Sequence, residues 1–176
     1  MSSINEQPDI GRRGLFTGAF LTRQGRQAVV RQQQSLGPVP PGLNIYSEQC
    51  GACEKQCAAA CPEDIIKLHP EQHCLAGTPY LEFSVNGCTF CGDCVDNCPS
   101  RTEIKEQPIN IGLVNIDYEK CLTRNSVFCI SCVGVCDFGA LKMDERRQLV
   151  GQEADCCGCG MCVHTCPVNA LEVQPV

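Results

Sequence analysis

The sequence has few of the large side chains that usually fill a protein core. It contains no tryptophan, three tyrosines and six phenylalanines among 176 residues. No segment approaches the roughly 18 consecutive apolar residues that a membrane-spanning helix needs. The chain also has no catalytic triad, phosphate-binding loop or dinucleotide fingerprint. These absences predict a protein that does not span a membrane, is not an enzyme with its own substrate site, and stabilises its core by other means.

Basic side chains are scarce in most of the chain. Residues 50–176 carry nine basic and seventeen acidic side chains, a net charge of -8, whereas residues 1–49 hold five arginines against three acidic side chains, a net charge of +2. An acidic body disfavours nucleic acid as a partner. Residues 1–49 have no cysteine and include the proline- and glycine-rich stretch 37–42, which predicts a basic arm followed by a stiff linker. The arm either folds on a partner or is a solvated tail.

Cysteine, by contrast, is abundant. The chain has 18 cysteines, above the level that indicates a disulfide or metal scaffold. Cys88–Pro99 and Cys156–Pro167 both follow the pattern Cys-x-x-Cys-x-x-Cys-x-x-x-Cys-Pro, which is the spacing of a [4Fe-4S] cluster motif. Zinc sites usually take two separated cysteine pairs, so zinc is a weaker alternative and disulfides are weaker still. We call these two segments motif 2 and motif 4.

Two further segments follow the pattern imperfectly. Motif 1, Cys50–Cys61, has one additional residue between its second and third cysteines, which predicts a bulged loop and a more labile cluster. Motif 3, Cys121–Cys136, has Ser126 where the first ligand should be, so Cys121 must reach the cluster from five residues upstream. Asp137 replaces the usual proline after motif 3. We expect four [4Fe-4S] clusters, with three as the alternative if the third site is empty or altered.

The predicted cofactor ligands are the sixteen cysteines of the four motifs. They are Cys50, Cys53, Cys57, Cys61, Cys88, Cys91, Cys94, Cys98, Cys121, Cys129, Cys132, Cys136, Cys156, Cys159, Cys162 and Cys166. In two-cluster ferredoxins the last cysteine of one motif binds the cluster of the other. Motif 1 could exchange this cysteine with motif 2 and motif 3 with motif 4 (sequential pairing), or motif 1 with motif 4 and motif 2 with motif 3 (nested pairing). Cys74 and Cys157 are expected to have no ligand role.

The segments between motifs predict small secondary-structure elements. Pro62 after motif 1 suits the first position of a helix, where no N–H is needed. Alternating residues put Leu81, Phe83 and Val85 on one face of a strand. Residues 109–116 and Leu171–Val173 supply further strands.

The predicted fold class is α+β, with tandem bacterial-type two-cluster ferredoxin-like modules of short helices and small antiparallel sheets. The expected divisions are a basic arm and linker at residues 1–49, motifs 1 and 2 at residues 50–105, and motifs 3 and 4 at residues 106–176. Because apolar side chains are few, bound clusters should act as the core of each module.

The chain is expected to be cytoplasmic. Arg12 and Arg13 resemble a twin-arginine leader, but Leu15–Leu21 is followed by Thr22–Arg26 and not by a sustained apolar region with a cleavage site. A reducing compartment would also keep the cysteines available for iron.

Several segments together resemble one known family, the NapF ferredoxin-type proteins of the periplasmic nitrate reductase system. They are Arg12–Gly18, Asn86–Cys91, the spacing of motif 3 and motif 4 with its proline. The resemblance covers nearly the whole chain and departs from the family at the additional residue in motif 1. It implies an accessory protein that binds the cytoplasmic precursor of the catalytic subunit NapA and assists its maturation before export, with electron transfer through [4Fe-4S] clusters. The alternative is a polyferredoxin subunit that feeds electrons to an oxidoreductase.

Overall fold

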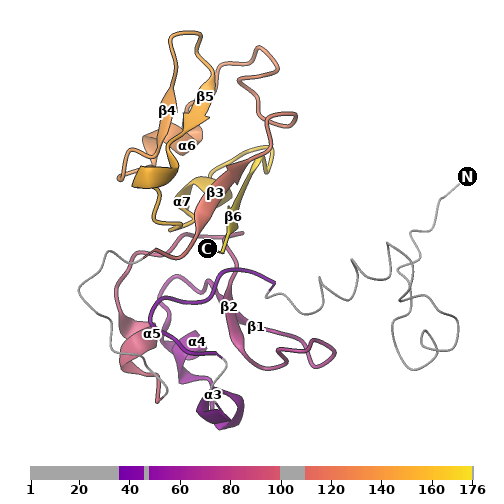
Figure 1. Cartoon of the computed structure of the whole chain (residues 1–176), viewed down its shortest axis with the longest axis vertical. Helices are drawn as coiled ribbons and strands as arrows, with labels where there is room; N and C mark the ends of the chain where they lie inside the picture. The colour runs from indigo at the N-terminus through magenta and orange to yellow at the C-terminus, as the bar shows by residue number, and fades with distance from the viewer. Residues whose placement is uncertain (1–35, 46–47, 100–109, 176) are drawn as a thin grey trace, which may run out of the picture.

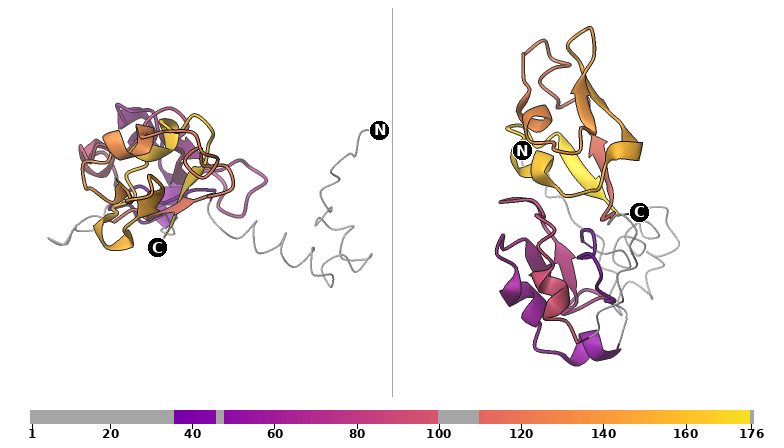
Figure 2. Two further views of the ribbon diagram at one scale, coloured as in Figure 1. Left: turned by 90° about the horizontal axis from the view of Figure 1, so that it is seen from above. Right: turned by 90° about the vertical axis from the view of Figure 1, so that its left-hand side faces the viewer.

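The computed structural model describes residues 36–45, 48–99 and 110–175 (Figure 1). Residues 1–35 of the basic arm and linker, and the module boundary expected near residue 105, lie outside the described residues. Within the described ranges, no helix is long and apolar enough to cross a membrane. We call residues 36–99 the first half and residues 110–175 the second half, and the two halves lie end to end (Figure 2).

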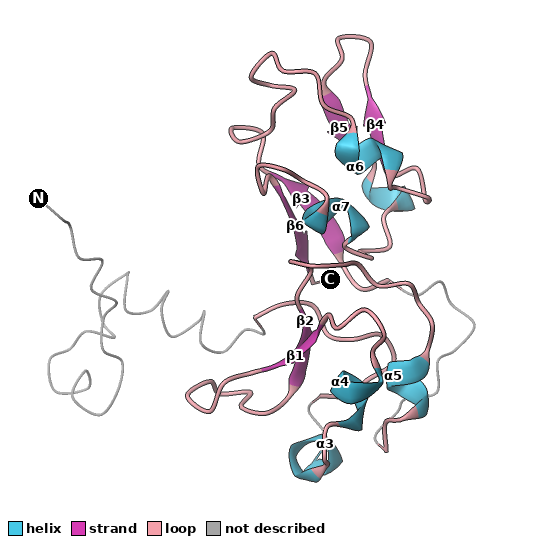
Figure 3. Cartoon of the chain, turned by 180° about the vertical axis from the view of Figure 1, so that it is seen from behind, coloured by secondary structure: helices cyan, strands magenta, loops and turns pink. Residues whose placement is uncertain are grey.

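All helices and strands in the described ranges are short (Figure 3). The first half contains α3 (Glu48–Ala52), α4 (Gln56–Ala60), β1 (Ile66–Leu68), β2 (Pro79–Leu81) and α5 (Asp93–Asp96). The second half contains β3 (Leu113–Ile116), α6 (Ser131–Gly134), β4 (Leu141–Met143), β5 (Leu149–Gly151), a 3-10 turn (η2, Glu153–Asp155), α7 (Met161–His164) and β6 (Leu171–Gln174).

Three antiparallel strand pairs organise these elements. β1 pairs with β2 and β4 pairs with β5, both as neighbours along the chain. β3 pairs with β6, with Val114 opposite Val173, so the beginning of the second half is joined to its end. The small helices and short antiparallel sheets confirm this part of the predicted fold class, and β6 confirms the strand expected at Leu171–Val173.

The strand expected through Val85 ends earlier than predicted. β2 stops at Leu81, and the chain bends at Ser84 and Val85. Leu81 and Phe83 are buried, but Val85 is 64% exposed. The alternating pattern therefore predicts the inward side chains correctly only up to the bend that leads into motif 2.

The helix expected after Pro62 is wrong. After motifs 1, 3 and 4, the carbonyl of the last cysteine accepts a hydrogen bond from the N–H three residues later, which closes a tight turn. The residues that donate are Asp64, Gly139 and Asn169, with φ of 51°, 66° and 49°. A left-handed residue cannot continue a right-handed helix, so the chain leaves the turn toward a strand. Four of the short helices, α4, α5, α6 and α7, lie inside the motifs instead and carry the third cysteine.

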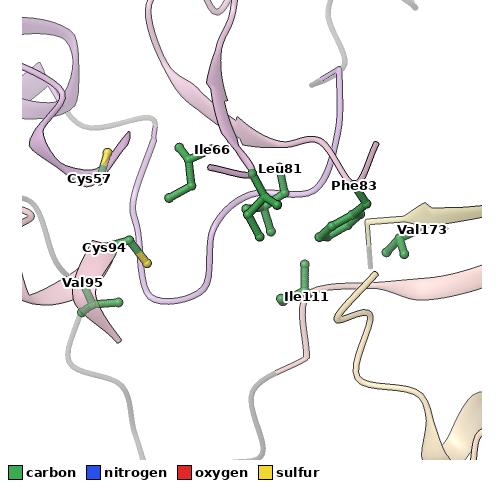
Figure 4. Close-up of a cluster of buried hydrophobic side chains, with 9 residues drawn as sticks. Cys57, Ile66, Leu81, Phe83, Cys94, Val95, Ile111 and Val173 are labelled. Atoms are coloured by element: carbon green, nitrogen blue, oxygen red, sulfur yellow. The ribbon is translucent and has the colours of Figure 1, made fainter. Parts of the chain in front are cut away.

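Cysteines form a large part of the buried core. In the first half, Ile66 and Leu81 pack in one cluster with Cys57 and Cys94 (Figure 4). In the second half, a separate set of apolar residues packs around three cysteines. It consists of Leu141, Leu149, Ala170 and Leu171 with Cys121, Cys132 and Cys162. The sulfur positions are therefore also core positions.

The stretch expected to be a linker packs against the rest of the first half. Pro40 is fully buried, Ile45 is 2% exposed, and the N–H of Leu81 donates to the carbonyl of Pro38. The N–H of Leu36 donates to Nε2 of His69 at 3.1 Å. His69 is buried, and its Nδ1 donates to the carbonyl of Thr78 at 2.7 Å. Residues 36–45 are thus held to the sheet of β1 and β2 by hydrogen bonds and apolar packing.

Candidate metal centres

Motifs 2 and 4 share one backbone conformation. Phe90 and Gly92 in motif 2 have φ of 56° and 87°, and Gly158 and Gly160 at the matching positions of motif 4 have φ of 71° and 78°. Left-handed residues are favoured at glycine and turn the chain sharply. A short helix begins directly after the second turn, α5 after Gly92 and α7 after Gly160, and carries the third cysteine of the motif.

Motif 1 reaches the same helix start with a lysine. Lys55 lies two residues before Cys57, as Gly92 lies two before Cys94, and its φ is 59°. The additional residue therefore lies before this turn, between α3 and α4, where the spacing predicts a bulge. The ammonium of Lys55 donates to the carbonyl of Cys50 and lies 3.9 Å from Sγ of Cys53. A positive charge thus accompanies the altered motif.

Motif 3 holds its distant first cysteine through a threonine. Cys121 is buried, and its Sγ lies 3.3 Å from Oγ1 of Thr123. That hydroxyl also accepts a hydrogen bond from the N–H of Leu149 in β5. The carbonyl of Thr123 accepts another from the side chain of Gln148. No spacing rule in the sequence indicates Thr123, since its role depends on contact with a strand about 25 residues away.

The cysteines of the four motifs gather in four groups. Three groups line openings that are partly open to solvent. Group 2 consists of Cys88, Cys91, Cys94 and Cys61. Group 3 consists of Cys121, Cys129, Cys132 and Cys166. Group 4 consists of Cys156, Cys159, Cys162 and Cys136. Each combines the first three cysteines of one motif with the last cysteine of the neighbouring motif.

Group 1 consists of Cys50, Cys53, Cys57 and Cys98. Burial raises the pKa of the Cys57 thiol, and negative charge on Cys98, Cys53 and Cys50 raises that pKa further. Burial also raises the pKa of Cys50, with Lys55 acting in the opposite direction. The four sulfurs therefore lie within electrostatic reach of one another. All four groups have the composition that sequential pairing requires, and none has that of nested pairing.

The third cysteine of each motif is buried. Burial and the neighbouring thiolates raise the pKa of Cys94 and of Cys132 to about 11, and that of Cys162 to about 12. Without a cation these side chains are neutral thiols at physiological pH. Metal binding requires the thiolate, so binding releases protons, and the charge of the bound iron offsets the cost of burying the sulfur.

The donor set fits a cluster better than a single ion. Among the described residues, no three His, Cys, Asp or Glu side chains converge closely enough to hold one metal ion. The thiols stand instead around the walls of openings whose other lining is mainly apolar. Thiolates are the ligands that iron-sulfur clusters prefer, and a [4Fe-4S] cluster takes four of them. Four thiols around each opening match that requirement.

Comparison with known proteins agrees with this chemistry. Residues 49–102, which contain motifs 1 and 2, match a family model described as a 4Fe-4S dicluster domain. Ferredoxin-type protein NapG of Escherichia coli K12 is 30% identical over 99% of this chain and 90% of its own length. Ferredoxin-type protein NapF of the same organism is 27% identical over 94% of this chain and 95% of its own length. The chain belongs to the ferredoxin-type Nap proteins.

Membership of this family confirms the resemblance found in the sequence and identifies [4Fe-4S] clusters as the cofactors. The sequence identities do not distinguish a NapF from a NapG relationship, because the chain is similar to both proteins over nearly its whole length. A ferredoxin of Methanothermococcus thermolithotrophicus is 34% identical over 35% of this chain and 97% of its own length. A ferredoxin-type Nap protein thus contains a stretch similar to almost an entire small ferredoxin.

Two cysteines of this ferredoxin-type Nap protein are not members of the four groups, and they have different surroundings. Cys74 is exposed, and its Sγ lies 3.9 Å from Nδ1 of His73. Cys157 lines the same opening as group 4, and burial raises the pKa of its thiol to about 12. Its carbonyl accepts a hydrogen bond from Ile111 at 2.9 Å, which fastens motif 4 to the segment before β3.

Proposed function

We propose that groups 1 to 4 each hold one [4Fe-4S] cluster and that the protein is a carrier of single electrons without its own substrate site. In this proposal the two halves are tandem two-cluster modules, at residues 50–105 and 106–176. The observation that carries the proposal is the gathering of four thiols in each group, with the last thiol supplied by the neighbouring motif. A bound cluster would supply reversible one-electron chemistry.

The chain's own residues would bind the clusters and adjust their potentials. Hydrogen bonds to ligand sulfurs and limited solvent access are among the main influences on the potential. The N–H of Ala170 donates to Sγ of Cys166 at 3.2 Å, so a ligand of group 3 already has such a bond. The apolar residues Leu149 and Leu171 line the same opening and limit the access of water.

Iron and acid-labile sulfide content tests this proposal. Protein purified without oxygen should contain iron and sulfide for four clusters per chain and should lose its visible absorption on oxidation. Iron for three clusters would leave one group empty, and Cys129→Ser should then cause no further loss if group 3 is the empty one. A colourless protein that contains zinc and no sulfide would overturn the proposal.

For the partner, we propose that the protein acts in the cytoplasm, binds the precursor of the nitrate reductase catalytic subunit NapA, and assists its maturation before export. Membership of the ferredoxin-type Nap proteins supports a role in that system. The contrast between a basic arm and an acidic body supports a docking role, because an arm of opposite charge can bind a surface that the body does not attract.

A binding experiment with unexported NapA tests the partner. Full-length protein with intact clusters should retain the NapA precursor, and a variant without residues 1–34 should bind it more weakly, since that variant keeps Leu36 and the packed segment. Equal binding by both proteins would show that the arm does not contribute to binding, and the proposed partner would stand. No retention by the full-length protein would contradict the proposal and favour an electron-transfer subunit that feeds another oxidoreductase. The similarity to an almost complete ferredoxin supports that second role.

A further inference from the structure

The two halves meet through a tight contact between motif 2 and motif 4. An ideal Cβ on Gly160 would lie 2.2 Å from the ring of Phe83, and one on Gly87 would lie 2.6 Å from the backbone nitrogen of Met161. Only hydrogen atoms fit at these two positions. Phe83 also belongs to a buried cluster that contains Ile111 and Val173 of the second half, and Figure 4 shows its side chain between these two residues and Leu81.

At the centre of this contact, the backbone of a cysteine in group 2 is hydrogen-bonded to the backbone of a cysteine in group 4. The N–H of Cys88 donates to the carbonyl of Cys159 at 2.6 Å. Their thiols are near each other as well: burial raises the pKa of Cys88, and negative charge on Cys61, Cys91 and Cys159 raises it further. Cys159 is the member of this set that comes from the other half. The two regular motifs thus lie against each other through ligand residues.

Within each half the two groups are also neighbours. Helix α4 packs against α5, and α6 packs against α7. Each of these helices carries the third cysteine of its motif, so the packing brings Cys57 near Cys94 and Cys132 near Cys162. The raised pKa values agree, since Cys57 contributes to that of Cys94 and Cys132 to that of Cys162, after burial in both cases. Groups 1 and 2 therefore adjoin in the first half, and groups 3 and 4 in the second.

We infer that the four groups form one series in the order 1, 2, 4, 3, and that electrons pass between the halves at Cys88 and Cys159. The inference rests on the proposed function, because it needs clusters in the groups. A one-electron reductant outside the protein, such as a reduced flavodoxin or ferredoxin, gives one electron at one end, and a one-electron acceptor takes it at the other. Each transfer would oxidise the cluster of one group and reduce the cluster of the next group with the same electron. No bond would form or break, and no proton would be required.

This order differs from the order of the motifs along the chain. Motif 3 follows motif 2 in the sequence, but its group is last in the series, since motif 4 occupies the contact with the first half. The series also has defined ends: the two altered motifs supply the first three ligands of the terminal groups 1 and 3, and the two regular motifs supply those of the central groups. A redox partner at one end would therefore reach the other end through both central groups.

Electron paramagnetic resonance of the complete, fully reduced protein tests the series. Reduced clusters that are near each other broaden and split one another's signals, and we expect interaction along the whole series. The spectrum of the unmodified protein should therefore not be reproduced by the sum of two independent cluster pairs. If such a sum does reproduce the spectrum, the halves are not in series and the inference is overturned, although the proposed function stands as long as iron and sulfide are present.

Gly87→Val isolates the contact between the halves. The added atoms meet the backbone of Met161 and Cys159, which cannot rotate away as a side chain can, so motif 4 must move away from motif 2. We expect unchanged iron and sulfide content and a loss of the interaction between the halves, so that two independent pairs now reproduce the spectrum. Gly87→Ala should give a smaller effect in the same direction.

Gly134→Val is the matched control. Gly134 lies in α6, and no atom lies within 4 Å of its ideal Cβ, so the spectrum should equal that of the unmodified protein. A Gly87→Val protein with full iron content and an unchanged spectrum would overturn the inference. If both Gly87 variants lose their clusters, the spectrum of the unmodified protein still decides whether the two halves interact. Absence of iron and sulfide from the unmodified protein would instead be a failure of the proposed function.

Discussion

The regular motifs 2 and 4 differ from the altered motifs 1 and 3 in what surrounds them. Motifs 2 and 4 contact each other, and glycines in or beside them fit against the opposite half with no space for a side chain. Motif 1 accommodates an additional residue with Lys55 in a left-handed conformation, and motif 3 reaches Cys121 across a loop that contains the exposed Ser126. The comparison indicates that spacing is constrained where a motif packs against the opposite half and can vary where it packs only within its own half.

Removal of a central ligand should have the largest effect. Cys162→Ser should cost the cluster of group 4 and destabilise that of group 2, because α7 holds Met161 against Gly87 and its loss loosens the contact at Cys88. Cys53→Ser in motif 1 should affect group 1 alone. Iron analysis with visible spectroscopy measures both: about half of the iron should be lost from the first variant and about a quarter from the second. Equal losses would remove the distinction between central and terminal motifs.

A pair of glycine variants measures the packing contribution alone. Gly160 and Gly92 occupy matching positions and both have positive φ, but only Gly160 has the Phe83 ring against it, and no atom lies within 4 Å of the ideal Cβ of Gly92. Gly92→Ala should cost about 1 kcal/mol for the left-handed backbone. Gly160→Ala should cost about 3 kcal/mol, because overpacking against a buried ring is added. Urea unfolding without oxygen, followed by cluster absorbance, measures the difference. Similar midpoints for both variants would show that the Phe83 contact does not constrain motif 4.

The charge in motif 1 should affect the potential of a terminal group. The ammonium of Lys55 lies 3.9 Å from Sγ of Cys53, and it stabilises the more negative, reduced state of a cluster bound there. Lys55→Gln should lower the potential of group 1 by about 50 mV or more, as expected for one charge near 4 Å in a partly exposed site. A redox titration followed by paramagnetic resonance measures the shift. Lys67→Gln is the control, since Lys67 pairs with Asp64 instead. The same shift in both variants would contradict a local effect of Lys55.

The smallest effect concerns pH and distinguishes the first half from the second. Burial lowers the pKa of His69 below its ordinary value of 6.5. Below that pH the unfolded chain binds a proton that the folded chain does not, so stability falls as the pH decreases from 6.5 toward the folded pKa. Protonation also removes the acceptor for the N–H of Leu36, worth about 1 kcal/mol.

The measurement compares the urea midpoint at neutral and mildly acid pH in the unmodified protein and in His69→Gln. Both proteins share any acid sensitivity of the clusters, so only the difference between them reports on His69. We expect the variant to lose part of the pH dependence. An identical pH dependence in the two proteins would mean that His69 does not hold residues 36–45 to the first half.

Part of this structure could be predicted from residue types at fixed spacing. The class of cofactor, the short antiparallel sheets and the strand at Leu171–Val173 all follow from local patterns. The expected helix after Pro62 failed because Asp64 takes a left-handed conformation, which proline at a helix start does not reveal. The expected linker at residues 37–42 packs because Pro40 and the carbonyl of Pro38 find partners in the sheet of β1 and β2, and those partners lie far along the chain.

The spacing of the cysteines by itself determined the chemistry of this protein, because three cysteines separated by two residues each can supply three thiolates to one cluster from a single short loop. The tertiary structure alone decided which motifs lie together and in what order. That order depends on the pairing of β3 with β6, on the packing of α4 with α5 and of α6 with α7, and on Phe83 meeting Gly160. These contacts join residues distant in sequence, and local spacing has no influence on them.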